Sequence, residues 1–203
     1  MQNKLAIDWD LYSNVYNGFL GQVEVAVPAT DKITTDASVL DMLANNRSQQ
    51  TRYRVYTNAK NSYNNYGSSL GVTYNFSGNY TLSGNINFSD ITKNKESDLF
   101  VTGFNTPKWA SNLSFGNREI VPNFGFNVVW KWQDAFDWES PLVNARVSAY
   151  HNIDAQMSYK LTKAVIKLGG SNVFNNHYIQ YAGGPTLGAL YYMSITFDNI
   201  LTK

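Results

Sequence analysis

The chain has 203 residues, of which 43% are hydrophobic, 15% aromatic and 15% charged, and its formal net charge at pH 7 is +1. With no Cys and only two His, it offers no disulfide, thiolate metal site or cysteine nucleophile, so we expect no metal and no cofactor. The near-zero net charge gives no electrostatic reason to expect a nucleic acid or an acidic partner.

The lack of any run of about 18 apolar residues excludes a transmembrane helix. It does not exclude a membrane protein, because a transmembrane β-barrel alternates apolar with polar residues and is polar on average. Residues 1–5 do not have the apolar core of a signal peptide, and we expect none in this chain.

Apolar and polar residues alternate with a period of two along eight stretches, which predicts β-strands with one apolar and one polar face. In one stretch, for example, Leu82 and Ile86 alternate with Ser83 and Asn85. The phase of the first stretch continues as far as Val27, so that strand is predicted to be long. In chain order the eight stretches cover residues 5–11, 70–76, 80–89, 109–115, 124–132, 153–159, 166–169 and 191–197.

Short and long connections alternate between these strands. The short ones are residues 77–79, 117–123 and 161–163, and the long ones are residues 28–51, 91–106, 134–146 and 175–187, with a short helix predicted at 37–47. This order is typical of outer-membrane barrels, which have tight periplasmic turns and long outer loops.

Aromatic residues on the apolar face gather at the two ends of the strands, as in the two aromatic girdles of a membrane barrel. A soluble β-sandwich is the alternative, but it must explain strands of ten or more residues, where about 5–6 is usual. The turn-end set is Phe76, Tyr80, Phe115, Phe124, Tyr159 and Phe197, and the opposite set is Phe88, Trp130, Trp132 and Tyr191.

Four segments resemble the closing strands of TonB-dependent receptors of the Bacteroidetes type. They are FNTPKWASNLSF (104–115), WKWQDAFDWES (130–140), KLGGSNVFNN (167–176) and GALYYMSITF (188–197). The resemblance implies an all-β fold in which residues 1–203 are about eight antiparallel transmembrane strands, the C-terminal part of a barrel of about twenty-two, without its plug domain.

By the same resemblance, the receptor would lie in the outer membrane of a Gram-negative bacterium and import a nutrient such as a siderophore, an oligosaccharide or a peptide. Its partners would be outer-membrane lipid, the plug domain, the remaining barrel strands and the inner-membrane TonB system, with a surface lipoprotein as a further candidate. The alternative is a small self-closed barrel with a binding or structural role and no active transport. Its interior would have to be filled by side chains, whereas the predicted inner wall is mostly Gly, Ser, Thr and Asn.

No residue set suggests catalysis, and we expect no enzyme. Charges predicted to face the lumen would contact a plug or line a path, or would simply be solvated or ion-paired; they are Asp8, Asp10, Lys131, Asp154, Lys160 and Lys167. Rings in the outer loops would stack on a ligand, contact a partner protein or anchor the loops to lipid headgroups. The candidate ligand-binding residues are Tyr53, Tyr56, Phe136, Trp138, His177, Tyr178 and Tyr181. For His177, which has no second His nearby in the sequence, an ordinary surface residue is the favoured alternative.

Overall fold

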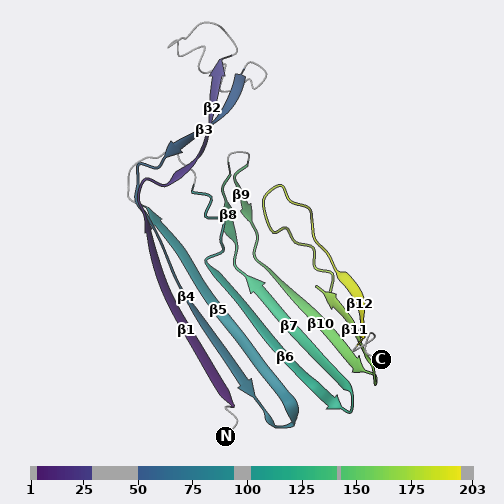
Figure 1. Ribbon diagram of the computed structural model, residues 1–203. Helices are drawn as coiled ribbons and strands as arrows, with labels where there is room; N and C mark the ends of the chain where they lie inside the picture. Colours follow the sequence, from purple (N-terminus) through teal and green to yellow (C-terminus); the bar gives the residue numbers. More distant parts are fainter. Residues whose placement is uncertain (1–3, 29–49, 94–101, 141–142, 198–203) are drawn as a thin grey trace, which may run out of the picture.

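The computed structural model describes residues 4–28, 50–93, 102–140 and 143–197. Most of them form one antiparallel sheet of eight strands, curved like a section of a barrel wall (Figure 1). The all-β prediction with eight main strands is therefore confirmed. In sheet order the strands are β1 (Leu5–Tyr16), β4 (Tyr63–Asn75), β5 (Tyr80–Lys93), β6 (Trp109–Val121), β7 (Phe124–Gln133), β10 (Tyr150–Lys160), β11 (Ala164–Ser171) and β12 (Leu190–Phe197).

The three short turns lie at one end of the sheet, where β1 begins at Leu5 and β12 ends at Phe197 (Figure 1). The turn between β4 and β5 is the 3-10 segment η2 (Ser77–Asn79), in which Gly78 has φ of 76° and Asn79 has φ of 64°. Glycine and asparagine tolerate positive φ, which is why these residues can form so tight a turn.

The predicted turn at 117–123 is wrong in length, because β6 continues to Val121 and only two residues connect it to β7. The register between β6 and β7 shifts between Asn117 and Val121. The buried Asn117 stabilises this irregularity, since its Nδ2 donates to the Gly78 carbonyl (2.7 Å) and its Oδ1 accepts from the Glu119 amide (2.8 Å).

The long first strand predicted up to Val27 is also wrong. The chain leaves β1 at Asn17 and Gly18, and Gly18 has φ of 59°. The following residues form β2 (Leu20–Pro28), which pairs with β3 (Gln50–Asn58) in a separate hairpin that projects beyond the loop end of the sheet (Figure 1). The helix predicted at 37–47 lies outside the described residues.

The eight-stranded sheet forms a single layer. Cross-strand partners share a face, so the register places Trp9, Leu70 and Ile86 side by side on the apolar face. Trp9 is 67% exposed and Met193 66% exposed. In the described part of the chain the buried apolar residues are few: Ala59, Tyr63, Phe136, Val147 and Ala164.

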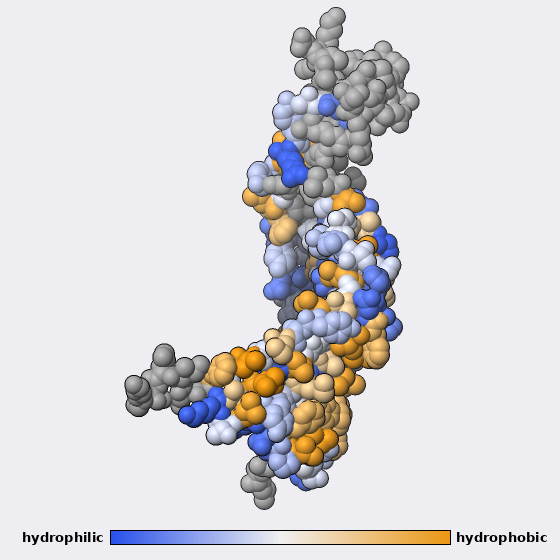
Figure 2. All heavy atoms as spheres, turned by 90° about the vertical axis from the view of Figure 1, so that its right-hand side faces the viewer, coloured by the Kyte–Doolittle hydropathy of each residue, from blue (hydrophilic) through white to orange (hydrophobic). Residues whose placement is uncertain are grey.

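A soluble sandwich would cover this apolar face with a second sheet. The other two sheets of the described chain are the β2–β3 hairpin and the short pair β8 (Phe136–Trp138) and β9 (Ala145–Val147), both at the loop end (Figure 1). Seen from the β12 side, hydrophobic residues gather over the lower half of the molecule (Figure 2). A face of this extent needs an apolar partner.

Within residues 4–28, 50–93, 102–140 and 143–197, no helix is long and apolar enough to cross a membrane.

Aromatic rings from adjacent strands contact each other at both ends of the apolar face. At the turn end, Tyr80 stacks on Phe115 with ring centroids 5.7 Å apart. At the loop end, Phe88 lies 4.8 Å from Trp109, and the Lys108 ammonium lies 5.6 Å from the Phe88 ring while it pairs with the Asp90 carboxylate at 2.6 Å. At each end of the apolar face, members of the aromatic set predicted from the sequence therefore contact a ring of the adjacent strand.

Candidate functional site

The predicted lumen charges share one face of the sheet, the polar face opposite the exposed apolar residues. The register connects Asp8 through Gly71, Asn85 and Asn112 to Lys131. The same register places all six on this face, but they do not form one cluster, because Asp8 and Asp10 lie on the edge strand β1 and the others on strands β7, β10 and β11. A lumen-lining role for them stays a prediction.

Lys131 and Asp154 form an ion pair that links β7 to β10, with 2.6 Å between Nζ and Oδ2. The other carboxylate oxygen, Oδ1, accepts hydrogen bonds from the Ser171 hydroxyl (3.1 Å) and the Asn172 amide (2.8 Å). Both carboxylate oxygens of Asp154 therefore have partners. Through them Asp154 links its own strand β10 to β7 and to the end of β11, near the last long loop.

Asparagines fix the start of that loop. Asn172 is fully buried with φ of 51°; its Nδ2 donates to the Asn176 carbonyl (2.7 Å) and its Oδ1 accepts from the Asn176 amide (3.0 Å). Asn175, with φ of 55°, accepts the Ala189 amide on its Oδ1 at 2.8 Å, which holds the far end of the loop. The sequence analysis used the segment 167–176 only for its resemblance to a receptor strand, and it did not predict that these asparagine side chains hold the loop.

Two tyrosines lie over glycines on the polar face. The Tyr192 hydroxyl donates to Gln156 Oε1 at 3.0 Å, and its ring occupies the space that a side chain at Gly169 would need. Tyr12 lies over Gly67 in the same way. These pairs were missed at the sequence level, because only the register brings a tyrosine opposite a glycine.

A hollow of about 380 Å³ opens at the loop end, between the β8–β9 hairpin and the last long loop. Its lining includes Arg146, Ser148 and Tyr150 from the hairpin side and His177, Tyr178 and Ile179 from the loop. The Tyr150 and Tyr178 rings lie 4.2 Å apart, and an isolated bridge between Tyr178 and Leu187 holds the loop closed.

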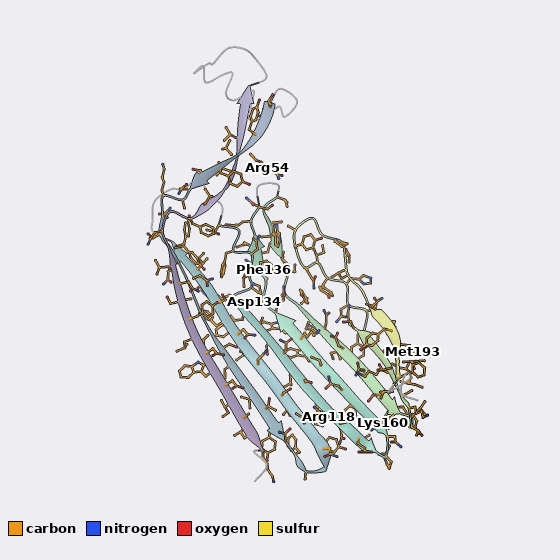
Figure 3. The ribbon with its side chains drawn as sticks, viewed as in Figure 1. Arg54, Arg118, Asp134, Phe136, Lys160 and Met193 are labelled. Carbon is orange, nitrogen blue, oxygen red and sulfur yellow. The ribbon has the colours of Figure 1, made fainter. Side chains whose placement is uncertain are left out.

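The candidate loop residues are only partly brought together. His177 and Tyr178 line the hollow, and Tyr181 contacts Trp138 beside it at 5.7 Å. Phe136 is 7% exposed, so its ring packs inside the protein and is not presented to a ligand. Tyr53 and Tyr56 are exposed on β3 and do not line the hollow. Figure 3 shows Arg54, which lies between them in the sequence, well above Phe136. In the part of the chain that the structure describes, no three His, Asp or Glu side chains gather as a metal site.

No protein-family model and no curated protein sequence matches the chain. Solved structures match over nearly its whole length. The copper transporter OprC covers 96% of the chain with a TM-score of 0.67 and 13% identity, and the FrpB iron transporter from Neisseria meningitidis (F3-3 variant) covers 97% with a TM-score of 0.66 and 14% identity. The ferripyoverdine receptor of the outer membrane of Pseudomonas aeruginosa covers 96% with a TM-score of 0.60 and 10% identity.

At these identities the matches show the fold. The curved sheet has the fold of part of a TonB-dependent receptor barrel. The chain spans 29%, 28% and 25% of the lengths of these three structures, so it corresponds to less than a third of each.

Proposed function

We propose that the chain is part of the barrel wall of a TonB-dependent receptor that imports a nutrient across a Gram-negative outer membrane. The observation that carries the proposal is a single-layer curved sheet with an exposed apolar face, which follows the wall of solved transporter barrels over 96% of this chain. The apolar face would meet lipid and the polar face the lumen. The protein would act by transport and not as an enzyme.

The open edges of the sheet support a segment of a larger barrel over the small self-closed barrel. Strand β1 pairs with β4 and β12 pairs with β11, so β1 and β12 are the two edges of the sheet order (Figure 1). In a bilayer such edges need partner strands, because lipid cannot satisfy their backbone groups. The remaining strands, the plug and the link to the TonB system would come from the rest of the receptor. The four resembling segments support a C-terminal position and the Bacteroidetes type.

The loop-end hollow is the proposed place of first contact with the nutrient. A volume of about 380 Å³ falls within the usual range of ~300–1,000 Å³ for small-molecule sites. Its aliphatic and aromatic wall and few hydrogen-bonding groups suit a ligand with a flat apolar surface and several polar atoms. A metal chelate, an oligosaccharide or a short peptide each has this chemistry.

Fractionation and uptake test the proposal together. The protein should sediment with the outer membrane and need detergent for extraction, whereas a monodisperse monomer in plain buffer would refute the membrane assignment. Cells without it should take up less of one class among labelled ferric chelates, oligosaccharides and peptides, and an uncoupler should abolish that uptake in the wild type. Ligand binding without energy-dependent uptake would favour the binding barrel instead.

For the hollow, Tyr178→Ala should weaken ligand binding about tenfold, the equivalent of ~1–1.5 kcal/mol for one ring contact. Tyr16→Ala, at the loop end of the edge strand β1, removes an exposed ring outside the candidate set; it is the matched control and should change affinity less than twofold. Equal effects of the two substitutions would place the binding site elsewhere.

A further inference from the structure

A second hollow, of about 1030 Å³, lies at the turn end of the polar face. Its lining includes Arg118 of β6, Ser158 and Lys160 of β10, and Lys4 just before β1. Figure 3 shows Arg118 and Lys160 near each other at the lower ends of their strands. The hollow is at the opposite end of the sheet from the loop aromatics.

The charge in this hollow is predominantly positive. Lys4, Arg118 and Lys160 face a single carboxylate in the lining, Glu119, whose Oε1 already accepts the Asn123 amide at 3.1 Å. Ion pairs within the described residues are Asp90–Lys108, Lys131–Asp154 and Asp137–Arg146, and none involves these three cations.

One more cation extends the cluster, because Lys167 lies directly across from Ser158 on the same face. The net charge of +1 concealed this cluster, since the balancing carboxylates lie elsewhere in the chain.

Unbalanced like charges repel one another, and the walls of a hollow focus the resulting field. The cations stand on or beside different strands, β1, β6 and β10, which favours an extended anionic partner over one small ion held by converging groups. Amide and hydroxyl groups in the same lining, such as those of Asn123 and Ser77, can donate hydrogen bonds to carboxylates or to a peptide backbone.

We propose that this basic hollow binds an acidic polypeptide segment that lies against the polar face of the sheet. The inference rests on the proposed function, because it takes the polar face to be the lumen wall. The occupant to which we commit is a segment of the same receptor rich in Asp and Glu. Charge complementarity supports this choice, as does the fact that the chain matches less than a third of each transporter, so that most of such a receptor lies outside it.

The test is photo-cross-linking in cells that produce the protein. A photoreactive amino acid replaces Ser158 in the hollow or, as a control, Leu168 on the opposite face, and mass spectrometry identifies the products. Ser158 should capture a peptide with an excess of Asp and Glu, and Leu168 should capture lipid. Capture at Ser158 of no polypeptide, or of a neutral or basic peptide, would overturn the inference.

Charge variants separate electrostatic binding from mere proximity. Arg118→Glu with Lys160→Glu should lower the Ser158 cross-link yield about fivefold or more, and Arg118→Gln with Lys160→Gln should lower it less. Lys163→Glu, in the adjacent turn outside the hollow, makes the same change of charge as either one of these reversals and should lower the yield less than twofold. A yield that does not depend on Arg118 and Lys160 would contradict the proposal.

The controls also distinguish a failure of this inference from a failure of the proposed function. Loss of the Leu168–lipid product, or a protein that leaves the membrane fraction, would show that the membrane assignment failed. Normal lipid capture and normal uptake without the acidic cross-link at Ser158 would overturn the basic-hollow inference alone.

Discussion

Substituting Ile86 by Arg is the sharpest test of which face of the sheet meets lipid. Ile86 is 43% exposed on the apolar face, opposite Leu70 and Ser111. It is the seventh of the 14 residues of β5, so each strand end lies about 20–24 Å away along the strand. With the usual tilt of about 45°, this corresponds to about 14–17 Å along the membrane normal, close to the midplane of the ~25 Å apolar band.

At that depth Ile86→Arg should reduce the free energy of unfolding by about 2–4 kcal/mol. The matched change on the polar face, Asn85→Arg, loses the two hydrogen bonds that Asn85 Oδ1 accepts from Asn112 (3.2 and 3.1 Å), and should cost about 1 kcal/mol. Asn85→Ala measures that loss without the charge.

The assay is reversible folding into lipid bilayers, followed by denaturant titration of each variant. If water covered the apolar face, Ile86→Arg would lie within about 0.5 kcal/mol of the wild type. A loss that small, or equal losses for Ile86→Arg and Asn85→Arg, would refute the face assignment.

Three further predictions use contacts of the same sheet. Gly169→Val should destabilise the protein by about 1–3 kcal/mol in denaturant titrations, because its Cβ would lie 2.5 Å from the Tyr192 hydroxyl, whereas Gly71→Val has no atom closer than 3.8 Å and should cost less than 1 kcal/mol. Asn172→Gly keeps the positive φ but removes two side-chain hydrogen bonds, so residues 175–187 should be cleaved faster in limited proteolysis and about 1–3 kcal/mol of stability should be lost; unchanged cleavage would mean that the side chain does not hold the loop. Cysteines placed at Trp9 and Met193 should not cross-link within a monomer, because β1 and β12 are opposite edges of the sheet, and efficient intramolecular cross-linking would instead support the self-closed barrel.

Alternation predicted the main strands well because each has one face in an apolar environment, and the pattern is strongest where that contrast is strongest, as at Ile86 and Asn85. The prediction failed where the chain left the eight-stranded sheet while the apolar residues stayed at odd-numbered positions. Val23 and Val25 continue the odd phase of β1 beyond Gly18, so periodicity alone could not detect the separate β2–β3 hairpin. It also missed the end of β6, because the irregularity after Asn117 disrupts the alternation.

The candidate sites were less predictable than the strands. Residue type identified Tyr178 and His177 as loop groups able to bind, but the hollow they line depends on Tyr150 and Arg146 of another connection. Likewise, Arg118 and Lys160 are 42 positions apart in the sequence, and only the curvature and register of the sheet bring them into one basic hollow. Such juxtapositions depend on loop placement and sheet curvature, which local patterns do not encode.

The order of strands has a consequence for how the sheet assembles. From β4 onward each strand pairs with the next main strand along the chain, and η2 closes the first of these pairs with only three residues. β1 instead reaches β4 across residues 17–62, and closing so long a loop costs about 2 kcal/mol more in chain entropy than closing a three-residue turn. We therefore expect β1 to join the sheet late. Substitutions in β1 should then mainly speed unfolding, while those in β4 and β5 should slow folding.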